Sequence, residues 1–138
     1  MQHTLSILTF QTQGHGLYEV TEPISDWLGS TGITRGLLTL LCQHTSAGLL
    51  ITENASPAVH RDLVRWFDAA APEGPGYEHS TEGPDDMPAH IKAVLSGATL
   101  SIPVADGRML LGTWQGVFIA EHRQEPLTRS IAAHLLGD

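Results

Sequence analysis

The sequence predicts an α+β fold, a single domain in which one mixed, largely antiparallel sheet packs against about three helices. Short apolar or alternating runs typical of strands occur near both ends of the chain, and apolar residues recur at helical spacing in three segments. These elements follow one another as strands, a helix, two strands, two helices and several strands. A length of 138 residues fits one core better than two. We therefore treat residues 1–138 as one domain.

The opening residues predict a hairpin followed by a helix. Residues 3–10 alternate in polarity, residues 16–20 give a second extended piece, and glycines between them allow a turn. Residues 22–30 place Ile24, Trp27 and Leu28 at helical spacing before a glycine stop. The helix is expected to pack on the sheet.

Two buried strands are predicted next, at residues 37–42 and 48–52, because both runs are short and apolar. The polar stretch between them contains His44 and Thr45. We expect these two residues to lie at one end of the sheet, where binding sites are often built.

The middle of the chain predicts two helices joined by a loop. Ser56 is a favourable N-cap for a helix over Pro57–Ala70, whose apolar residues recur every three or four positions. Residues 72–84 are rich in Gly and Pro, which favours a loop. Asp86 is expected to cap the second helix, which carries His90.

The last third predicts mainly strands. Asp106-Gly107 is a turn signal that should join residues 99–104 and 108–111 in a hairpin. Residues 117–123 form a further apolar strand. Residues 127–136 are ambiguous between strand and helix from their pattern alone.

The acidic composition limits the classes of partner. Lys and Arg total 7 against 15 Asp and Glu, a formal net charge of −8, which opposes binding to nucleic acid or to an anionic membrane surface. A small phosphorylated substrate stays compatible with it, since a few cations or a metal hold phosphate locally. One cysteine excludes an intrachain disulfide, and there is no apolar run of membrane-spanning length. We expect a cytoplasmic protein.

Three histidines in separate segments, His44, His79 and His90, suggest a metal site. Imidazole is the commonest metal ligand, so three such groups with an open position would suit zinc, and added carboxylates would favour magnesium or manganese. None of the three belongs to a compact metal motif. The alternative interpretation is that each is a hydrogen-bonded structural residue.

Glu121 and Arg123 lie on one face of the strand over 117–123. Burying Glu121 without a partner would cost several kcal/mol, so it must be paired, metal-bound or near water. A structural pair with Arg123 or with another subunit and a functional role are equally consistent with the sequence.

Several short motifs occur together in the order of a known family, and the chain resembles the YjbQ family, whose members are often labelled secondary thiamine-phosphate synthases. The matching segments are Gln43-His44-Thr45-Ser46-Ala47, Glu53-Asn54, Tyr77-Glu78-His79, Asp85-Asp86-Met87-Pro88-Ala89-His90-Ile91-Lys92, Gly112-Thr113-Trp114-Gln115-Gly116 and Glu121-His122-Arg123.

The resemblance implies a half-barrel-like sheet, a homotrimer, and a strand over residues 127–136. Relatives often have Asp where this chain has Ser56, so a carboxylate that serves metal or substrate there would be missing, although the helix cap is kept. The expected roles are catalysis by Glu121, Asn54 and Gln115, substrate binding by Lys92, Arg123, Thr45 and Trp114, and binding of a divalent metal by His44, His79 and His90.

The activity implied joins hydroxymethylpyrimidine diphosphate to thiazole phosphate, which gives thiamine phosphate and releases pyrophosphate. Two other interpretations stay open. One is a metal-dependent hydrolase of a small phosphorylated metabolite, and the other is a non-catalytic trimer that binds an anion or another ligand.

Overall fold

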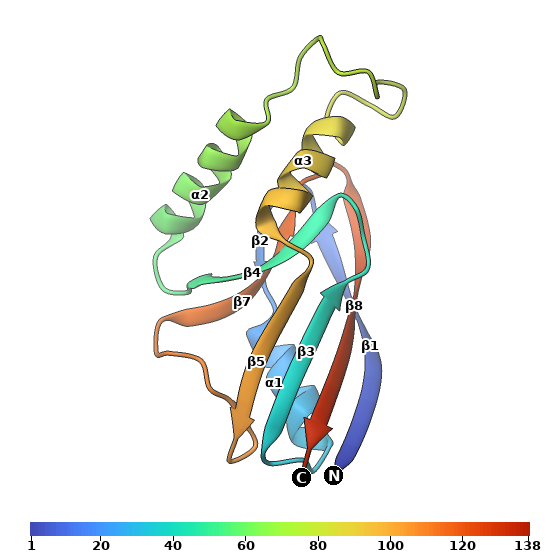
Figure 1. Ribbon diagram of the computed structural model, residues 1–138. Helices are drawn as coiled ribbons and strands as arrows, with labels where there is room; N and C mark the ends of the chain where they lie inside the picture. Colours follow the sequence, from blue (N-terminus) through green and yellow to red (C-terminus); the bar gives the residue numbers. More distant parts are fainter.

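Figure 1 shows the computed structural model, which describes residues 1–138. Three helices and eight strands follow one another along the chain. Their bounds are β1 Gln2–Gln13, β2 Gly16–Glu19, α1 Thr21–Ser30, β3 Gly36–Cys42, β4 Ala47–Glu53, α2 Pro57–Ala70, α3 Asp86–Ser96, β5 Thr99–Ala105, β6 Arg108–Met109, β7 Gln115–Glu121 and β8 Pro126–Gly137.

The strands form a curved, half-barrel-like antiparallel layer, which confirms the predicted α+β fold. Hydrogen bonding divides this layer into a five-stranded sheet of order β1-β8-β3-β5-β6 and a three-stranded sheet of order β2-β7-β4. Every pairing in both sheets is antiparallel. The chain ends meet at one end of this layer (Figure 1).

The predicted opening hairpin is wrong. Strand β1 pairs with β8 over its whole length, from Gln2 opposite Gly137 to Gln13 opposite Pro126, and β2 pairs with β7 in the other sheet. A distant strand of equal length gives β1 more cross-strand contacts than the four residues of β2 can offer. The same pairing resolves the ambiguity at residues 127–136, which are a strand.

The core fills the concave side of the five-stranded sheet. A cluster of 16 buried residues includes Ile24 and Leu28 of α1 together with the inward side chains of β3, β5 and β8. Helices α2 and α3 lie instead at one end of the molecule, where α3 contacts β4 and α2 contacts β2 (Figure 1). His79, Asp86, His90 and Lys92 lie in or just before α3 at that end.

Of the two predicted caps, Ser56 occupies the N-cap position of α2, whereas Asp86 does not cap α3. The Ser56 side chain makes no capping bond; instead Glu53 Oε2 accepts hydrogen bonds from the backbone N–H groups of Ala55 and Ser56 at 2.9 and 2.8 Å. The capping position of α3 is Asp85, and Asp86 is the first helical residue. Asp86 is therefore free to point its carboxylate toward other side chains.

Candidate functional site

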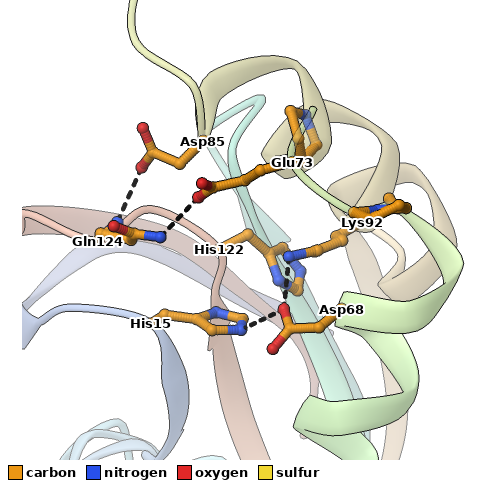
Figure 2. A pocket seen from close by; sticks show the side chains of 10 residues that line it. His15, Asp68, Glu73, Asp85, Lys92, His122 and Gln124 are labelled. Atoms are coloured by element: carbon orange, nitrogen blue, oxygen red, sulfur yellow. Dashed lines mark hydrogen bonds and ion pairs between the residues drawn. The ribbon is translucent and has the colours of Figure 1, made fainter. Parts of the chain in front are cut away.

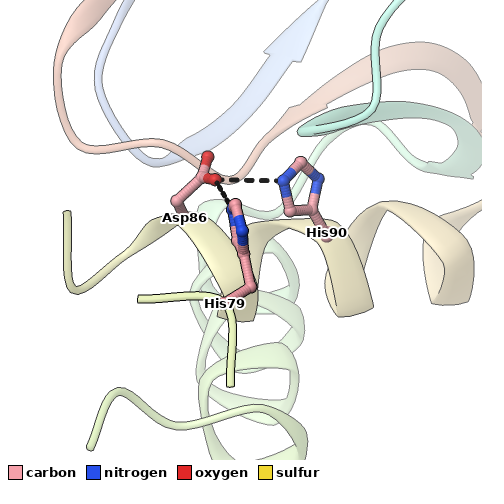
Figure 3. A group of neighbouring side chains, drawn as sticks. All are labelled: His79, Asp86 and His90. Atoms are coloured by element: carbon pink, nitrogen blue, oxygen red, sulfur yellow. Dashed lines mark hydrogen bonds and ion pairs between the residues drawn. The ribbon is translucent and has the colours of Figure 1, made fainter. Parts of the chain in front are cut away.

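Asp86 lies between two histidines at the start of α3 (Figure 3). His79, from the loop before the helix, places Nε2 at 2.7 Å from Asp86 Oδ2, and His90 places Nε2 at 3.0 Å from the same oxygen. Asp86 and His90 meet because residues four apart share one face of a helix. The three ligand atoms lie within 4.8 Å of one another. Because these atoms could together hold one metal ion, we call His79, Asp86 and His90 the metal group.

The hydrogen bonds of His90 fit a cation at this position. Its Nδ1 lies 2.8 Å from the carbonyl oxygen of Thr45, which accepts only, so Nδ1 carries a hydrogen. In a neutral ring Nε2 then presents a lone pair to the Asp86 carboxylate. Two lone pairs that face each other require either a second proton on the ring or a shared cation. A metal ion between the two groups accepts both lone pairs. A backbone carbonyl on the other nitrogen is the usual support of a ligating histidine.

Asp86 is held in its charged form. Burial alone would raise the pKa of Asp86, but hydrogen bonding to His79 and the charges of His90 and Arg123 outweigh it and lower that pKa below the ordinary value. Arg123 Nη1 donates to Asp86 Oδ1 at 2.6 Å, while its Nε donates to Asp85 Oδ2 at 3.0 Å. Arg123, expected to bind substrate, therefore orients the carboxylate of the metal group.

His44 is not part of the metal group. Its Nε2 accepts a hydrogen bond from the backbone N–H of Ser130 at 2.8 Å, so the remaining hydrogen of the neutral ring is on Nδ1. Burial, followed by the charge of Arg129, lowers the pKa of His44, which keeps the ring neutral. His44, Thr45 and His90 nevertheless line one shallow groove of about 370 Å³. This geometry makes His44 a hydrogen-bond donor beside the metal group.

Glu121 pairs with a residue that the sequence did not single out. Its side chain is completely buried, and it accepts hydrogen bonds from Arg129 Nε at 2.7 Å and from the Thr12 hydroxyl at 2.6 Å. Burial would raise the pKa of Glu121, but Arg129 and Thr12 outweigh it and lower that pKa. The side-chain pair between Glu121 and Arg123, one of the alternatives left open by the sequence, is absent; only the backbone N–H of Arg123 donates to Glu121 Oε2, at 3.1 Å.

Lys92 lies on the other side of α3 from the metal group. Its ammonium donates to Asp68 Oδ1 at 2.7 Å inside a polar cavity that His15 and His122 also line (Figure 2). Lys92 and His90 are two positions apart, which is about 200° around a helix. Lys92 therefore cannot share a ligand with the metal group within one subunit.

Asn54, Trp114 and Gln115 gather at the opposite end of the small sheet. Asn54 Nδ2 donates to the carbonyl oxygen of Gln115 at 3.4 Å, and Trp114 is 64% exposed. In the β4–β7 pairing, Gln115 lies opposite Glu53, and Glu121 lies opposite Ala47. Six strand residues span about 20 Å, so these three side chains are far from the metal group of the same subunit.

Sequence reasoning missed four polar residues, and only one of them left a clear signal. Asp86 and His90 at i and i+4 on a predicted helix could have been recognised as a ligand pair. The other three come close to their partners only through sheet pairing or helix packing. They are His15, His122 and Arg129.

Comparison with known proteins identifies the family. The UPF0047 YjbQ-like family profile matches residues 6–138. The chain belongs to this family. It is 47% identical over 133 residues to a UPF0047 protein of Synechocystis, covering 96% of this chain and 90% of the relative. It is 43% identical over 132 residues to YjbQ of Escherichia coli O157:H7, covering 95% and 96%.

Solved structures of the family share the fold. A YjbQ/UPF0047 protein of Clostridium acetobutylicum superposes with a TM-score of 0.87 at 31% identity and covers 95% of this chain and 99% of that one. A YbjQ-like protein of Sulfolobus solfataricus reaches the same TM-score of 0.87 at 19% identity, covering 99% and 100%. Among the helices of this YjbQ-like chain, none has both the length and the apolar character that spanning a bilayer requires.

Proposed function

We propose that the protein is a divalent-metal-dependent enzyme that acts on a small phosphorylated substrate. The observation that carries the proposal is the convergence of His79 Nε2, His90 Nε2 and Asp86 Oδ2 within 4.8 Å, with His90 fixed by the Thr45 carbonyl. Two imidazoles and one carboxylate are a donor set of catalytic zinc sites, and such sites keep a position open for water or substrate.

The activity that we propose first is thiamine phosphate synthesis, as the family resemblance implies. The bond between the pyrimidine methylene carbon and its diphosphate breaks, and a bond from that carbon to the thiazole nitrogen forms. When bound, a divalent metal neutralises the departing diphosphate. His44 Nδ1–H, at the edge of the groove that it shares with His90, is placed to donate to a phosphate oxygen.

A hydrolase is the second candidate, favoured by the same donor set. In zinc hydrolases with two histidines and a carboxylate, the metal activates a water molecule in its open position. The two activities differ in their second substrate, because the hydrolase needs only water and the synthase needs thiazole phosphate.

The experiment supplies purified protein with zinc, magnesium or manganese and with hydroxymethylpyrimidine diphosphate, with and without thiazole phosphate. Thiamine phosphate that forms above the level of His90→Ala supports the synthase. Pyrophosphate or phosphate release that does not depend on thiazole phosphate supports the hydrolase. If neither product exceeds the His90→Ala control with any of the metals, both activities are rejected for this substrate.

The proposal includes a homotrimer. The outer face of the five-stranded sheet carries the exposed side chains of Leu5, Ile7, Leu37, Leu41 and Leu136. Cross-strand pairing places them on one face with neighbours such as Thr39, Ala132 and His134, and the only charged side chain on this face is Arg108, opposite Ala105 on the edge strand β6. We call it the outer apolar face. A second subunit that covers it removes the leucines from water.

A homotrimer would also bring Asn54, Trp114 and Gln115 near a metal group. The sheet places Asn54, Trp114 and Gln115 at the far end of β7, about 20 Å along the strand from Glu121. In the trimer, these residues would lie beside the metal group of another subunit. The catalytic roles expected for Asn54 and Gln115 therefore depend on assembly.

A further inference from the structure

A polar cavity of about 310 Å³ lies between α2, α3 and the end of β7 (Figure 2). This volume is at the lower end of the range of about 300–1,000 Å³ for small-molecule sites. Pro88 and Lys92 of α3 line it, whereas Asp86 and His90 belong to the metal group. The two sets are two helix positions apart, so the cavity and the metal group lie on opposite faces of α3.

His122 brings an unused acceptor to this cavity. The residue is 3% exposed, and its Nδ1 is buried without a hydrogen-bond partner. Its Nε2 lies 3.2 Å from Ser96 Oγ, whose own hydrogen is donated to the carbonyl oxygen of Ala93 at 3.3 Å. Nε2 therefore donates to Ser96, and Nδ1 has a free lone pair. Gly48 allows this arrangement, because a Cβ there would collide with Ser96 Oγ.

The charge state of His122 agrees with this assignment. Burial, followed by the positive charges of His15 and Lys92, lowers the pKa of His122 to about 3. The ring is neutral at physiological pH and keeps its lone pair. Buried polar atoms in folded proteins almost always have a partner, so an orphan nitrogen at the wall of a cavity indicates that something else supplies the hydrogen.

Lys92 brings unused donors to the same cavity. It is 6% exposed, and one of its three N–H groups donates to Asp68 Oδ1 at 2.7 Å. His15 Nε2 lies 2.8 Å from that same oxygen, and no hydrogen bond involves Asp68 Oδ2. Two N–H groups of a buried ammonium and one carboxylate oxygen are therefore open to a ligand.

Glu73 adds a second carboxylate on the wall formed by the loop after α2. Its Oε1 accepts a hydrogen bond from Gln124 Nε2 at 2.6 Å, and Oε2 has no partner. The unused groups around the cavity are thus several acceptors and the donors of one side chain. The acceptors include His122 Nδ1, Asp68 Oδ2 and Glu73 Oε2, with Asp85 Oδ1 as a further one, and the donors are on Lys92 Nζ.

We propose that this cavity binds a small zwitterionic amino compound, of which a free α-amino acid is the simplest example. The ligand ammonium donates to His122 Nδ1 and to the carboxylates of Asp68 and Glu73, and its acidic group accepts from Lys92. A simple anion would face the carboxylates of Asp68, Glu73 and Asp85, and a simple cation would face the Lys92 ammonium, so a molecule with both charges matches the walls best. The proposal does not depend on the metal group.

The test follows the His122 ring by NMR in the full chain labelled with ¹⁵N-histidine. Glycine and alanine are titrated first. Glycine betaine is the matched control, because it keeps both charges but has no N–H to donate. Ethylamine, acetate and inorganic phosphate each supply one half of the zwitterion. We expect glycine or alanine to shift Nδ1 of His122 in a saturable way, and betaine to leave it unchanged.

Two variants locate the binding groups. Glu73→Gln changes an exposed loop residue, and Lys92→Met removes the donors; each should weaken binding by about tenfold or more. Glu78→Gln, in the same loop but outside the cavity, should bind as the parent does. Thermal unfolding checks that each variant is folded.

Three outcomes overturn the proposal. The first is that no amino compound shifts the ring at millimolar concentrations, which leaves a buried water as the partner of Nδ1. The second is that acetate or phosphate binds as tightly as the amino acids, which makes the cavity an anion site. The third is that Glu73→Gln and Lys92→Met bind as the parent does, which places the ligand elsewhere.

Discussion

Arg123 Nη1 donates a hydrogen bond of 2.6 Å to Asp86 Oδ1, so the residue two positions after β7 holds the first residue of α3. The other Asp86 oxygen faces His79 and His90. One carboxylate therefore has a supporting side and a ligand side.

Removing Arg123, which supports the Asp86 carboxylate, should weaken metal binding without removing a metal ligand. For Arg123→Gln we expect zinc affinity, measured by calorimetry, to fall by about 10- to 100-fold, as for other outer partners of metal ligands. Arg123→Lys should recover only part of it, because lysine lacks the planar fork that also engages Asp85. Arg108→Gln, on an exposed strand, is the control. Unchanged affinity in Arg123→Gln would show that Asp86 needs no support.

His44→Ala should retain the metal. The backbone N–H of Ser130 occupies Nε2, and Nδ1 carries the ring hydrogen, so neither nitrogen offers a lone pair to a cation. We expect His44→Ala to bind one cobalt(II) ion per chain with the parent's visible spectrum, whereas His90→Ala loses it. Loss of cobalt in His44→Ala would restore His44 as a ligand.

Breaking the buried pair of Glu121 and Arg129 should be costly. Glu121→Gln leaves the Arg129 charge without its partner in the interior, and we expect the free energy of unfolding to fall by about 3–5 kcal/mol. The double variant Glu121→Leu with Arg129→Met removes both charges and should lose less. Urea unfolding at neutral pH measures both. A loss below about 1 kcal/mol in Glu121→Gln, a value typical of exposed pairs, would contradict the burial of this pair.

His122 should make the protein less stable in mild acid. The unfolded chain takes up a proton at His122 near the ordinary pKa of about 6.5, whereas the folded chain does so only at about 3. The contribution of His122 to stability is therefore complete above pH 6.5 and declines as the pH falls toward 3, by about 1.4 kcal/mol per pH unit.

Urea unfolding of His122→Phe between pH 7 and pH 5 checks this dependence. The variant should lose most of the decline seen in the parent, and exposed His3→Gln should keep it. If His122→Phe shows the same decline as the parent, another group causes it.

Charge on the outer apolar face should prevent assembly. Leu136 is 42% exposed and lies opposite Leu37 in the β3–β8 pairing. By light scattering we expect the parent to be a trimer and Leu136→Asp to be a folded monomer, because three carboxylates cannot be buried together without partners. Thr99→Asp, at the margin of the face, is the milder control. A trimeric Leu136→Asp protein would place the interface elsewhere.

Local sequence patterns were sufficient to predict the elements whose structure depends on neighbouring residues. The helix over Pro57–Ala70 was predicted with its observed bounds, because a proline start and a regular apolar stripe are both written in adjacent residues. The turn at Asp106-Gly107 likewise has the positive φ angles, 53° and 72°, that such a turn demands.

The candidate site shows where local patterns fail. His79 and His90 were found by residue type, and Asp86 was seen only as a cap. No residue near His44 in the sequence indicates that its Nε2 accepts a hydrogen bond from Ser130, which lies 86 positions away. Similarly, Arg123 was one candidate partner of Glu121 in the sequence, yet the side chain that pairs with it is Arg129 of β8.

The sequence by itself thus determined the class of fold, most helices and strands, and the residue types able to hold a metal or phosphate. Only the tertiary structure decided which of them meet. Pairing of β1 with β8, rather than with β2, depends on contacts more than 100 positions apart, and the turn of α3 separates Lys92 from His90. Such distances result from the summed packing of the whole chain, which no short segment encodes.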